Sequence, residues 1–375
     1  MPDPADADTL ARRVAGFGLP GADDRPWSIP DDVWPSLLAS LAAQRITGLA
    51  VAGAEAEWLL LSDPQAEELL SRHRDTMLWA LTVERKLLAL AAEFRAAGIG
   101  LVVLKGPAVA HRFYPDPSWR GFGDLDVLVR TRDWRAACAL LEDLGLHRGL
   151  PEPRSGFDER FGKAAEYRGS DGCEVDLHRT LVVGPFGLWI DPDEMFERTT
   201  EFRLGGVSLR RLEDTVAFLH ACVHASLGWW PPLLTPVRDV AQIATRGEVD
   251  WAAAADLARG WRLAVVVRHA LETVEELLGT EVPEAARGLL ALRPGRREAR
   301  LLEAYTTDRR RRGAVDLATL RAIRGPRAKA AFIRDLLVPG RVFLAARSAG
   351  RPPSYVRRWL VPLRWVLERP KNGQG

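Results

Sequence analysis

Two aspartates separated by one residue, Asp124 and Asp126, are the pair in this sequence best placed to do chemistry. They lie in residues 121–129, which read GFGDLDVLV and are typical of a glycine loop followed by a strand. Because side chains alternate between the two faces of a strand, both carboxylates should project from the same face. Carboxylate oxygens are the ligands that hard divalent cations prefer. A metal site is one interpretation, and a strand edge with two solvated acids is the other.

A second strand-like segment, residues 173–179, carries three more ionisable side chains. Glu174, Asp176 and His178 alternate there with apolar residues and should share one face. Three such groups on one face are hard to explain by packing alone, so Asp176 is a candidate third carboxylate. Glu174 is either a further ligand or a solvated acid. His178 would orient Asp176, contact a substrate or serve a structural purpose.

Upstream of the aspartate pair, Lys105 and Gly106 lie at a turn between the apolar run 101–104 and a predicted helix. Free backbone N–H groups at a helix start, with a lysine beside them, are suited to binding phosphate. Arg120 lies shortly before the aspartates and can add a bidentate phosphate contact. The order of these residues therefore indicates a phosphate-bearing substrate next to a metal.

Composition places the chain among globular proteins, because 47% of its 375 residues are hydrophobic and 27% are charged. This length predicts two or three domains. The sequence contains no run of about 18 uncharged apolar residues, so a membrane span is not expected, and the acidic N-terminus does not resemble a signal peptide. The three cysteines lack metal-binding spacing, and a reducing, cytoplasmic location is predicted. A kinase is disfavoured because no P-loop or kinase glycine loop is present.

The net charge of +2 hides an asymmetry along the chain. From residue 293 onward, 21 Lys and Arg stand against 6 Asp and Glu, which leaves +15 there and −13 on residues 1–292. Such a basic segment indicates attraction to a polyanion, an anionic membrane surface or the body of the protein. The run RRWLVPLRWVLERP mixes Arg, Trp and Leu as interfacial helices do. An arginine-rich helical surface without a partner is the other interpretation.

Periodicity predicts a mixed α/β core between helical regions. Residues 1–30 read as a loose leader, and a long helix follows in which five apolar residues recur at three- and four-residue spacing: Leu78, Leu81, Leu87, Leu88 and Ala91. A hairpin is predicted over residues 200–212, turning at Gly205-Gly206. The predicted divisions are an N-terminal leader and helical region, an α/β core, a helical domain and a basic helical tail, over residues 1–75, 76–212, 213–292 and 293–375.

Together these motifs resemble the nucleotidyltransferase superfamily that includes polymerase β, antibiotic nucleotidyltransferases and the MNT antitoxins, and most of all a bacterial nucleotidyltransferase-like family. Its pattern is an apolar strand ending in L-K-G, a Tyr, an Arg, D-h-D-h-h-h (h, hydrophobic), a later h-D-h-H, and a helical half with histidines and an Arg-Asp pair. The matching residues here are Leu104-Lys105-Gly106, Tyr114, Arg120, 124–129, 175–178, His220, His224, Arg238 and Asp239. The resemblance covers roughly residues 75–275 and implies an α+β nucleotidyltransferase fold, with a mixed sheet core flanked by helical N-terminal and C-terminal regions.

The resemblance also implies a reaction, the transfer of a nucleoside monophosphate from a nucleoside triphosphate, with release of pyrophosphate. Asp124 and Asp126 would hold two Mg²⁺ ions about 3.5–4 Å apart. Asp176 would complete the metal site and serve as the general base. ATP is the expected donor. Four residues would bind the nucleotide: Lys105, Gly106, Tyr114 and Arg120.

Residues of the helical half would line the substrate pocket. His220 and His224 lie four apart on one helix face and belong to a core, a pocket or a zinc pair. Arg238 and Asp239 either face the cleft, as the family pattern favours, or form a structural ion pair. The tryptophans at 229 and 230 would wall an acceptor pocket or, in the favoured interpretation, fill the core.

The turn at Gly106-Pro107 departs from the superfamily, which has Gly-Ser or Gly-Gly there. Proline supplies no N–H and no hydroxyl, so phosphate donors are missing unless Lys105 and Arg120 compensate. A catalytically silent fold that binds or regulates is therefore an alternative. The acceptor stays open among a small-molecule hydroxyl, a sugar phosphate, a peptide side chain and an RNA end. The family's association with biosynthetic loci favours a small molecule or peptide, whereas residues 293–375 would suit RNA or an anionic membrane.

Overall fold

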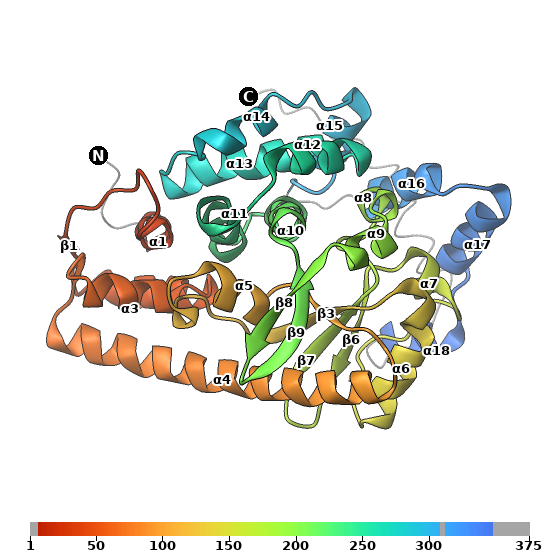
Figure 1. Cartoon of the computed structure of the whole chain (residues 1–375), viewed down its shortest axis with the longest axis horizontal. Helices are drawn as coiled ribbons and strands as arrows, with labels where there is room; N and C mark the ends of the chain where they lie inside the picture. The colour runs from red at the N-terminus through yellow and green to blue at the C-terminus, as the bar shows by residue number, and fades with distance from the viewer. Residues whose placement is uncertain (1–6, 308–311, 348–375) are drawn as a thin grey trace, which may run out of the picture.

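The structure is a computed structural model that describes residues 7–307 and 312–347. Its centre is a seven-stranded mixed sheet with helices on both faces (Figure 1). In chain order the strands are β3 (Val102–Val103), β4 (Asp124–Leu128), β5 (His147–Arg148), β6 (Ala164–Arg168), β7 (Glu174–His178), β8 (Thr199–Leu204) and β9 (Val207–Leu212). Their order in the sheet is β5-β6-β7-β4-β3-β9-β8. The predicted α+β class, a mixed sheet core between helical regions, is confirmed.

Strand β4 lies in the middle of the sheet, parallel to β7 and antiparallel to β3. In β4 and β7 polar residues alternate with apolar ones, so the register decides which face receives the charged groups. The register sets three pairs opposite one another: Asp124 with Glu174, Asp126 with Asp176, and Leu128 with His178. The ionisable residues of both strands therefore share one face.

The predicted hairpin is present as β8 and β9, which pair antiparallel from Thr199 opposite Leu212 to Leu204 opposite Val207. Gly205 and Gly206 both have positive φ, at 53° and 83°. A two-residue hairpin turn of type I′ needs this left-handed backbone at both central positions, and glycine adopts it without steric cost. The hairpin closes one edge of the sheet, beside β3.

One face of the sheet is covered by α4 (Asp63–Ala96) and α6 (Trp134–Asp143). Val83, Leu87 and Phe94 of α4 belong to the same buried cluster as the apolar residues that alternate with the ionisable ones in β4 and β7. Leu78 and Leu81, which share the sequence periodicity, are 64% and 58% exposed. Because α4 is one continuous helix, the boundary predicted between residues 75 and 76 falls inside it.

The opposite face of the sheet is covered by the helical half of the chain. It contains α10 (Asp214–Leu227), α11 (Leu234–Arg246), α12 (Trp251–Gly260) and α13 (Ala264–Leu278). Helix α10 is buried around almost its whole circumference, since it packs against α11, α12 and α13 and lies above the sheet (Figure 1). Leu128 of β4 packs in the same core as these helices, so the ionisable face of β4 and β7 is the one that looks toward α10.

The N-terminal helices are α1 (Ala7–Gly16), α2 (Trp34–Ala43) and α3 (Thr47–Glu55), with a small parallel pairing of β1 (Trp27–Ser28) and β2 (Leu59–Leu60). Ala11, Val14 and Ala15 of α1 are fully buried, because this helix packs against α2, α11 and α13. The prediction of a loose leader over residues 1–30 is therefore wrong from residue 7 onward, and residues 1–6 lie outside the described part.

Helix α3 also touches the segment that leads into β4. A Cβ atom at Gly48 would lie only 2.0 Å from the carbonyl oxygen of Ser118, in the short helix η1 (Pro117–Trp119). Any side chain at position 48 would therefore push α3 away from η1. This close approach ties the N-terminal helices to the segment that leads into β4 and its aspartate pair.

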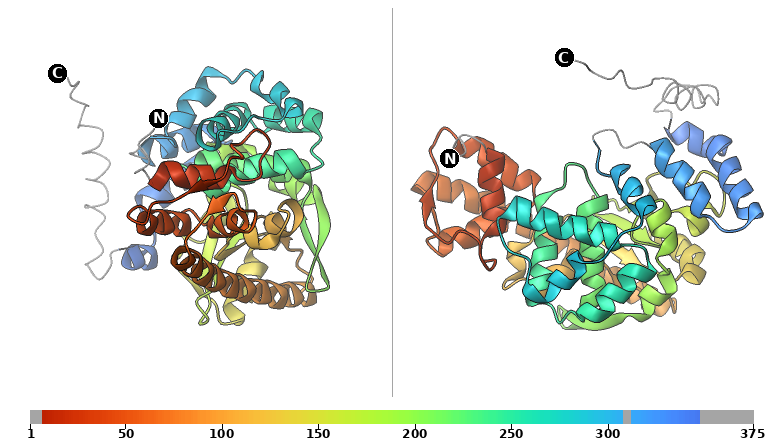
Figure 2. Two further views of the ribbon diagram at one scale, coloured as in Figure 1. Left: turned by 90° about the vertical axis from the view of Figure 1, so that its left-hand side faces the viewer. Right: turned by 90° about the horizontal axis from the view of Figure 1, so that it is seen from above.

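The basic segment from residue 293 packs against the body of the protein as far as the structure describes it. It forms α15 (Arg296–Glu303), α16 (Arg312–Ala322), α17 (Pro326–Leu337) and α18 (Arg341–Arg347), the last three at the opposite end from the N-terminal helices (Figure 2). Leu301 and Leu302 join the main core, and the hydroxyl of Tyr305 donates to the carbonyl oxygen of Val183 at 2.7 Å. The run RRWLVPLRWVLERP lies outside the described residues. Within the described part, no helix combines the length and apolar character needed to cross a bilayer.

Candidate active site

Asp126, Asp176 and His178 come together where β4 and β7 lie side by side. One ligand atom from each residue lies within 4.8 Å of the other two, an arrangement that could hold a metal ion. Asp126 and His178 are buried, and Asp176 is partly exposed. Glu174 is half exposed and pairs with Arg168, so it behaves as a solvated acid at the edge of this group.

The ammonium of Lys105 lies between the two aspartates of β4. Its Nζ atom is 2.7 Å from Oδ2 of Asp126 and 3.3 Å from Oδ2 of Asp124. Burial works to lower the pKa of Lys105, but the carboxylates of Asp126 and Asp124 outweigh it and raise the pKa. Burial works to raise the pKa of Asp126, but Lys105 and His178 hold it well below its ordinary value. An internal cation therefore keeps this buried carboxylate charged.

The neighbours of His178 determine where its protons lie. Its Nδ1 atom is 3.1 Å from the carbonyl oxygen of Thr180, and its Nε2 atom is 2.9 Å from Oδ1 of Asp126. Because a carbonyl oxygen only accepts, Nδ1 must be the donor. Nε2 then either carries a second proton and donates to Asp126, or offers its lone pair to a metal ion shared with the carboxylates. Thr180 fixes the orientation of the ring in both states.

Asp176 has an unusually high pKa for an aspartate. Burial raises the pKa to about 6, with His178 opposing the shift and Asp126 reinforcing it. A cation held between the two carboxylates would relieve their repulsion. The two carboxylates suit Mg²⁺ or Mn²⁺, whereas an imidazole is more typical of the sites of zinc and iron. The residues present therefore fit a divalent ion.

Asp124 lies at the outer edge of this group. It pairs with two cations and is not one of the three clustered ligand residues. Its Oδ1 atom accepts from Nη1 of Arg45 at 3.0 Å, while Oδ2 faces Lys105. Burial works to raise the pKa of Asp124, and these cations outweigh it and lower the pKa. Sequence reasoning missed Arg45, because it follows α2 in the N-terminal region and belongs to no motif.

Arg120 and Tyr114 are committed to a buried carboxylate instead of facing a phosphate. The guanidinium of Arg120 donates to Asp239 through Nε at 2.9 Å and Nη2 at 2.7 Å, and the Tyr114 hydroxyl donates to the same carboxylate at 2.9 Å. All three side chains are buried. The expected phosphate contact of Arg120 and the nucleotide contact of Tyr114 therefore find no support here. The network instead ties the loop before β4 to α11.

Arg238 lies in the interior and, among the described residues, forms no ion pair with its neighbour Asp239, so neither the cleft role nor the structural pair finds support here. It is 1% exposed and donates to the carbonyl oxygens of Ala15 and Phe17 at 2.9 and 2.6 Å. These contacts complete the end of α1, where helix carbonyls need partners. The tryptophans at 229 and 230 are exposed rather than part of the core, which removes the interpretation as core filler.

His220 and His224 lie on α10, the helix that covers the ionisable face of the sheet. Their ring centroids are 6.4 Å apart. Burial, reinforced by His178, lowers the pKa of His220 to about 3, and burial with Lys105 lowers that of His224 well below its ordinary value. Both rings are therefore neutral at neutral pH. Among the described residues neither belongs to a cluster of three ligand side chains, which speaks against a zinc site, and a role in the substrate pocket stays a prediction.

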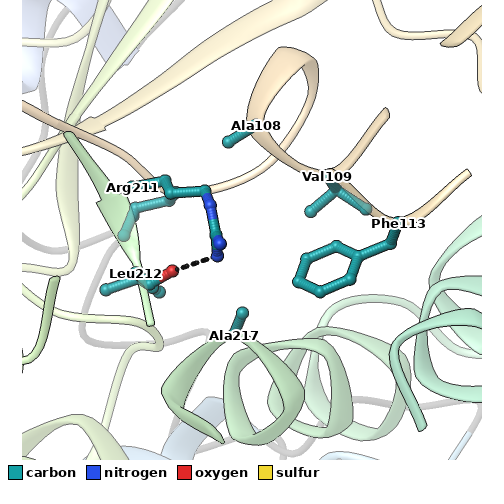
Figure 3. A pocket seen from close by; sticks show the side chains of 7 residues that line it. Ala108, Val109, Phe113, Arg211, Leu212 and Ala217 are labelled. Carbon is teal, nitrogen blue, oxygen red and sulfur yellow. Dashed lines mark hydrogen bonds between the residues drawn. The ribbon is translucent and has the colours of Figure 1, made fainter. Parts of the chain in front are cut away.

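The turn at Gly106-Pro107 opens helix α5 (Pro107–Phe113) and has a φ of 61° at Gly106. Behind α5 is a narrow recess with no room for a water molecule (Figure 3). Its lining is apolar apart from Arg211, whose guanidinium points into the recess and donates to the carbonyl oxygen of Leu212 at 2.8 Å. No carboxylate of the candidate site lines it, so this recess is a packing feature and not the substrate pocket.

Comparison with known proteins agrees with the resemblance drawn from the motifs. The sequence profile of an uncharacterised nucleotidyltransferase family matches residues 30–279, about two thirds of the chain. The chain belongs to this family, which confirms the family prediction and supports nucleotidyl transfer as its general activity. A comparison with curated proteins gave no match. The crystal structure of an antigenic nucleotidyltransferase-like protein from Paracoccidioides brasiliensis matches with a TM-score of 0.34 and 15% identity, over 54% of this chain and 95% of that one.

Proposed function

We propose that this protein is a metal-dependent nucleotidyltransferase that moves a nucleoside monophosphate from a nucleoside triphosphate, ATP first among them, to an acceptor. The observation that carries the proposal is the Asp126–Asp176–His178 cluster, with Asp124 and Lys105 beside it, in a member of a nucleotidyltransferase family. Burying neighbouring carboxylates is costly unless cations compensate them. Lys105 compensates Asp124 and Asp126, whereas Asp176 forms no ion pair among the described residues, so the cluster can accept a further cation.

Asp126, Asp176 and His178 would hold one Mg²⁺ or Mn²⁺ ion, and Asp124 is the candidate ligand of a second. When bound, the ions would neutralise charge on the triphosphate and stabilise the charge that develops during transfer. Lys105 places a positive charge next to Asp124, and there it would also face the phosphate oxygens of the triphosphate.

Asp176 is the candidate general base. Its side chain is the more exposed of the two carboxylates in the cluster, so it is the one that an acceptor hydroxyl could approach and give its proton to. The acceptor oxygen would bond to the α-phosphorus as the bond from that phosphorus to the bridging oxygen of pyrophosphate breaks. The acceptor proton goes to Asp176, and pyrophosphate leaves with the electron pair of the broken bond.

Removal of the metal tests the proposal without knowledge of the acceptor. In calorimetric titrations, Mg²⁺ with ATP should bind the wild-type chain, and excess EDTA should weaken ATP binding at least about tenfold, because the ions are expected to contribute several kcal/mol to contacts with phosphate. Readdition of Mg²⁺ should restore the affinity. An ATP affinity that changes neither with Mg²⁺ nor with EDTA would contradict a metal-dependent site.

The acceptor is sought by pyrophosphate release with a panel of alcohols, sugar phosphates, peptides and RNA ends. We propose a small molecule or peptide first. Binding of Mg²⁺ and ATP without pyrophosphate release on any acceptor would favour the catalytically silent alternative, in line with the donor missing at Pro107. An RNA acceptor would require salt-sensitive RNA affinity.

Deletion of residues 293–375 cannot test RNA binding cleanly, because Leu301 and Leu302 belong to the core. Substitution of the exposed Arg296, Arg297 and Arg300 with Gln avoids this difficulty. If RNA binds there, each lost phosphate contact should reduce the slope of log affinity against log salt by about 0.7 to 0.9. An unchanged slope in filter-binding assays would exclude this surface as the RNA site.

A further inference from the structure

Arg45 reaches the mouth of the carboxylate site from a part of the chain that no motif covers. Its Nη1 atom lies 3.0 Å from Oδ1 of Asp124, on the side opposite the oxygen that faces Lys105. The Arg45 side chain is 51% exposed, whereas that of Lys105 is 16% exposed. The two cations therefore lie at different depths, with Lys105 inside and Arg45 at the opening.

The backbone around Arg45 is held in place by the start of α11. The Thr235 hydroxyl donates to the carbonyl oxygen of Gln44, and the backbone N–H of Leu234 donates to the side-chain oxygen of Gln44 at 2.7 Å. A Cβ atom at Gly123 would lie 3.8 Å from Nη2 of Arg45, so the guanidinium lies beside the glycine loop that leads into Asp124. Arg45 is thus fixed at its base, and its guanidinium is exposed.

Most of the donors of Arg45 are unused. A guanidinium carries five N–H donors, and within the described residues its hydrogen bonding is limited to Asp124. Because the Arg45 side chain is half exposed, its pair with Asp124 contributes little to stability, and the contact is easily exchanged for a better partner. Two parallel N–H donors match the oxygens of a phosphate group.

We propose that Arg45 is a binding residue for a phosphate group of the nucleotide. This inference rests on the proposed function and assigns to Arg45 the phosphate contact that Pro107 lacks and that Arg120, paired with Asp239, does not offer. Once Asp124 serves as a metal ligand, the guanidinium beside it faces the space that the triphosphate would occupy. Arg45 and Lys105 then bracket the phosphates from the opening and from the interior.

The test compares Arg45→Gln with Arg12→Gln, a matched loss of one positive charge at an exposed residue of α1. In calorimetric titrations, ATP with Mg²⁺ should bind Arg45→Gln about 10 to 100 times more weakly, as expected for one charge-assisted contact. Inorganic tripolyphosphate should show a similar loss, because the contact is to phosphate. Arg45→Lys should bind with intermediate affinity, because lysine keeps the positive charge but lacks the two parallel N–H donors of the guanidinium.

Mn²⁺ binding without nucleotide separates this role from a structural one. Removing a cation beside Asp124 should leave Mn²⁺ affinity unchanged or tighter, and the melting temperature should stay near that of wild type. Equal losses of Mn²⁺ affinity and ATP affinity in Arg45→Gln would overturn the inference. So would equal ATP affinities of Arg45→Gln and Arg12→Gln, provided that wild type shows Mg²⁺-dependent binding. Failure of wild type to bind ATP with Mg²⁺ would instead overturn the proposed function, and the Arg45 inference with it.

Discussion

Replacement of Asp126 with asparagine is expected to slow nucleotidyl transfer at least about a thousandfold, equivalent to about 4 kcal/mol of transition-state stabilisation. Asparagine keeps the shape of the side chain but removes the charge that a divalent ion requires. It also takes the closest carboxylate from Lys105, which would be left with Asp124 at 3.3 Å. The loss should appear in kcat, measured as pyrophosphate release at saturating ATP and Mg²⁺.

Two further variants make this result interpretable. Asp143→Asn, at an exposed position of α6, removes the same charge away from the site and should keep wild-type activity. Asp176→Asn lies on the rim of the cluster and should lose activity to a comparable degree while disturbing the core less. A folded Asp126→Asn variant, judged by circular dichroism, with a wild-type rate of transfer would contradict the assignment.

Replacement of Asp239 with alanine is expected to reduce the free energy of unfolding by about 3–5 kcal/mol, because it leaves a buried charge without its partner. The carboxylate accepts from Arg120 and from Tyr114, and all three residues are buried. Removing it strands a guanidinium and a hydroxyl in the interior between α11 and the loop before β4. Urea unfolding followed by tryptophan fluorescence measures the change.

The matched comparison is Asp256→Ala, which removes an exposed partner of Arg259 and should cost less than about 1 kcal/mol. The triple variant Asp239→Leu, Arg120→Met, Tyr114→Phe removes all the polar groups together and should recover part of the lost stability. If Asp239→Ala lowers the free energy of unfolding no more than Asp256→Ala does, the network does not hold the loop in place. If transfer activity is then unaffected as well, it does not position the aspartate pair.

The parts of the structure that follow local periodicity could be predicted from the sequence. Alternation in β4 and β7 correctly indicated that Asp126, Asp176 and His178 project from strand faces, and the two glycines at 205 and 206 fixed the hairpin turn. These patterns depend on neighbours only a few residues apart, so a single sequence contains all the information that they need.

Partners far apart in the chain could not be predicted. Arg45 meets Asp124 across 79 residues, and Arg120 meets Asp239 across 119. Neither pair has a spacing that a motif could reveal, because tertiary packing alone brings them together. Arg120 also has the residue type and position of a phosphate ligand, and only the structure shows its guanidinium committed to a buried carboxylate.

Which residues of a helix are buried likewise depends on which other segments of the chain pack against it. Leu78 and Leu87 of α4 are nine residues apart and so lie on opposite sides of the helix. The sheet covers the side that carries Leu87, together with Ala80 and Val83, and leaves Leu78 exposed to solvent. Helix α1 is buried because α11 and α13, more than 200 residues later, pack against it. The amino-acid composition of the N-terminal segment does not predict that contact.

The most direct measurement for the central claim is anomalous diffraction from crystals grown with Mn²⁺ and a non-hydrolysable ATP analogue. The proposed function predicts an anomalous peak bounded by Asp126, Asp176 and His178, with the triphosphate next to Asp124 and Lys105. A fully occupied nucleotide bound elsewhere, or bound at this site without manganese at these side chains, would contradict it.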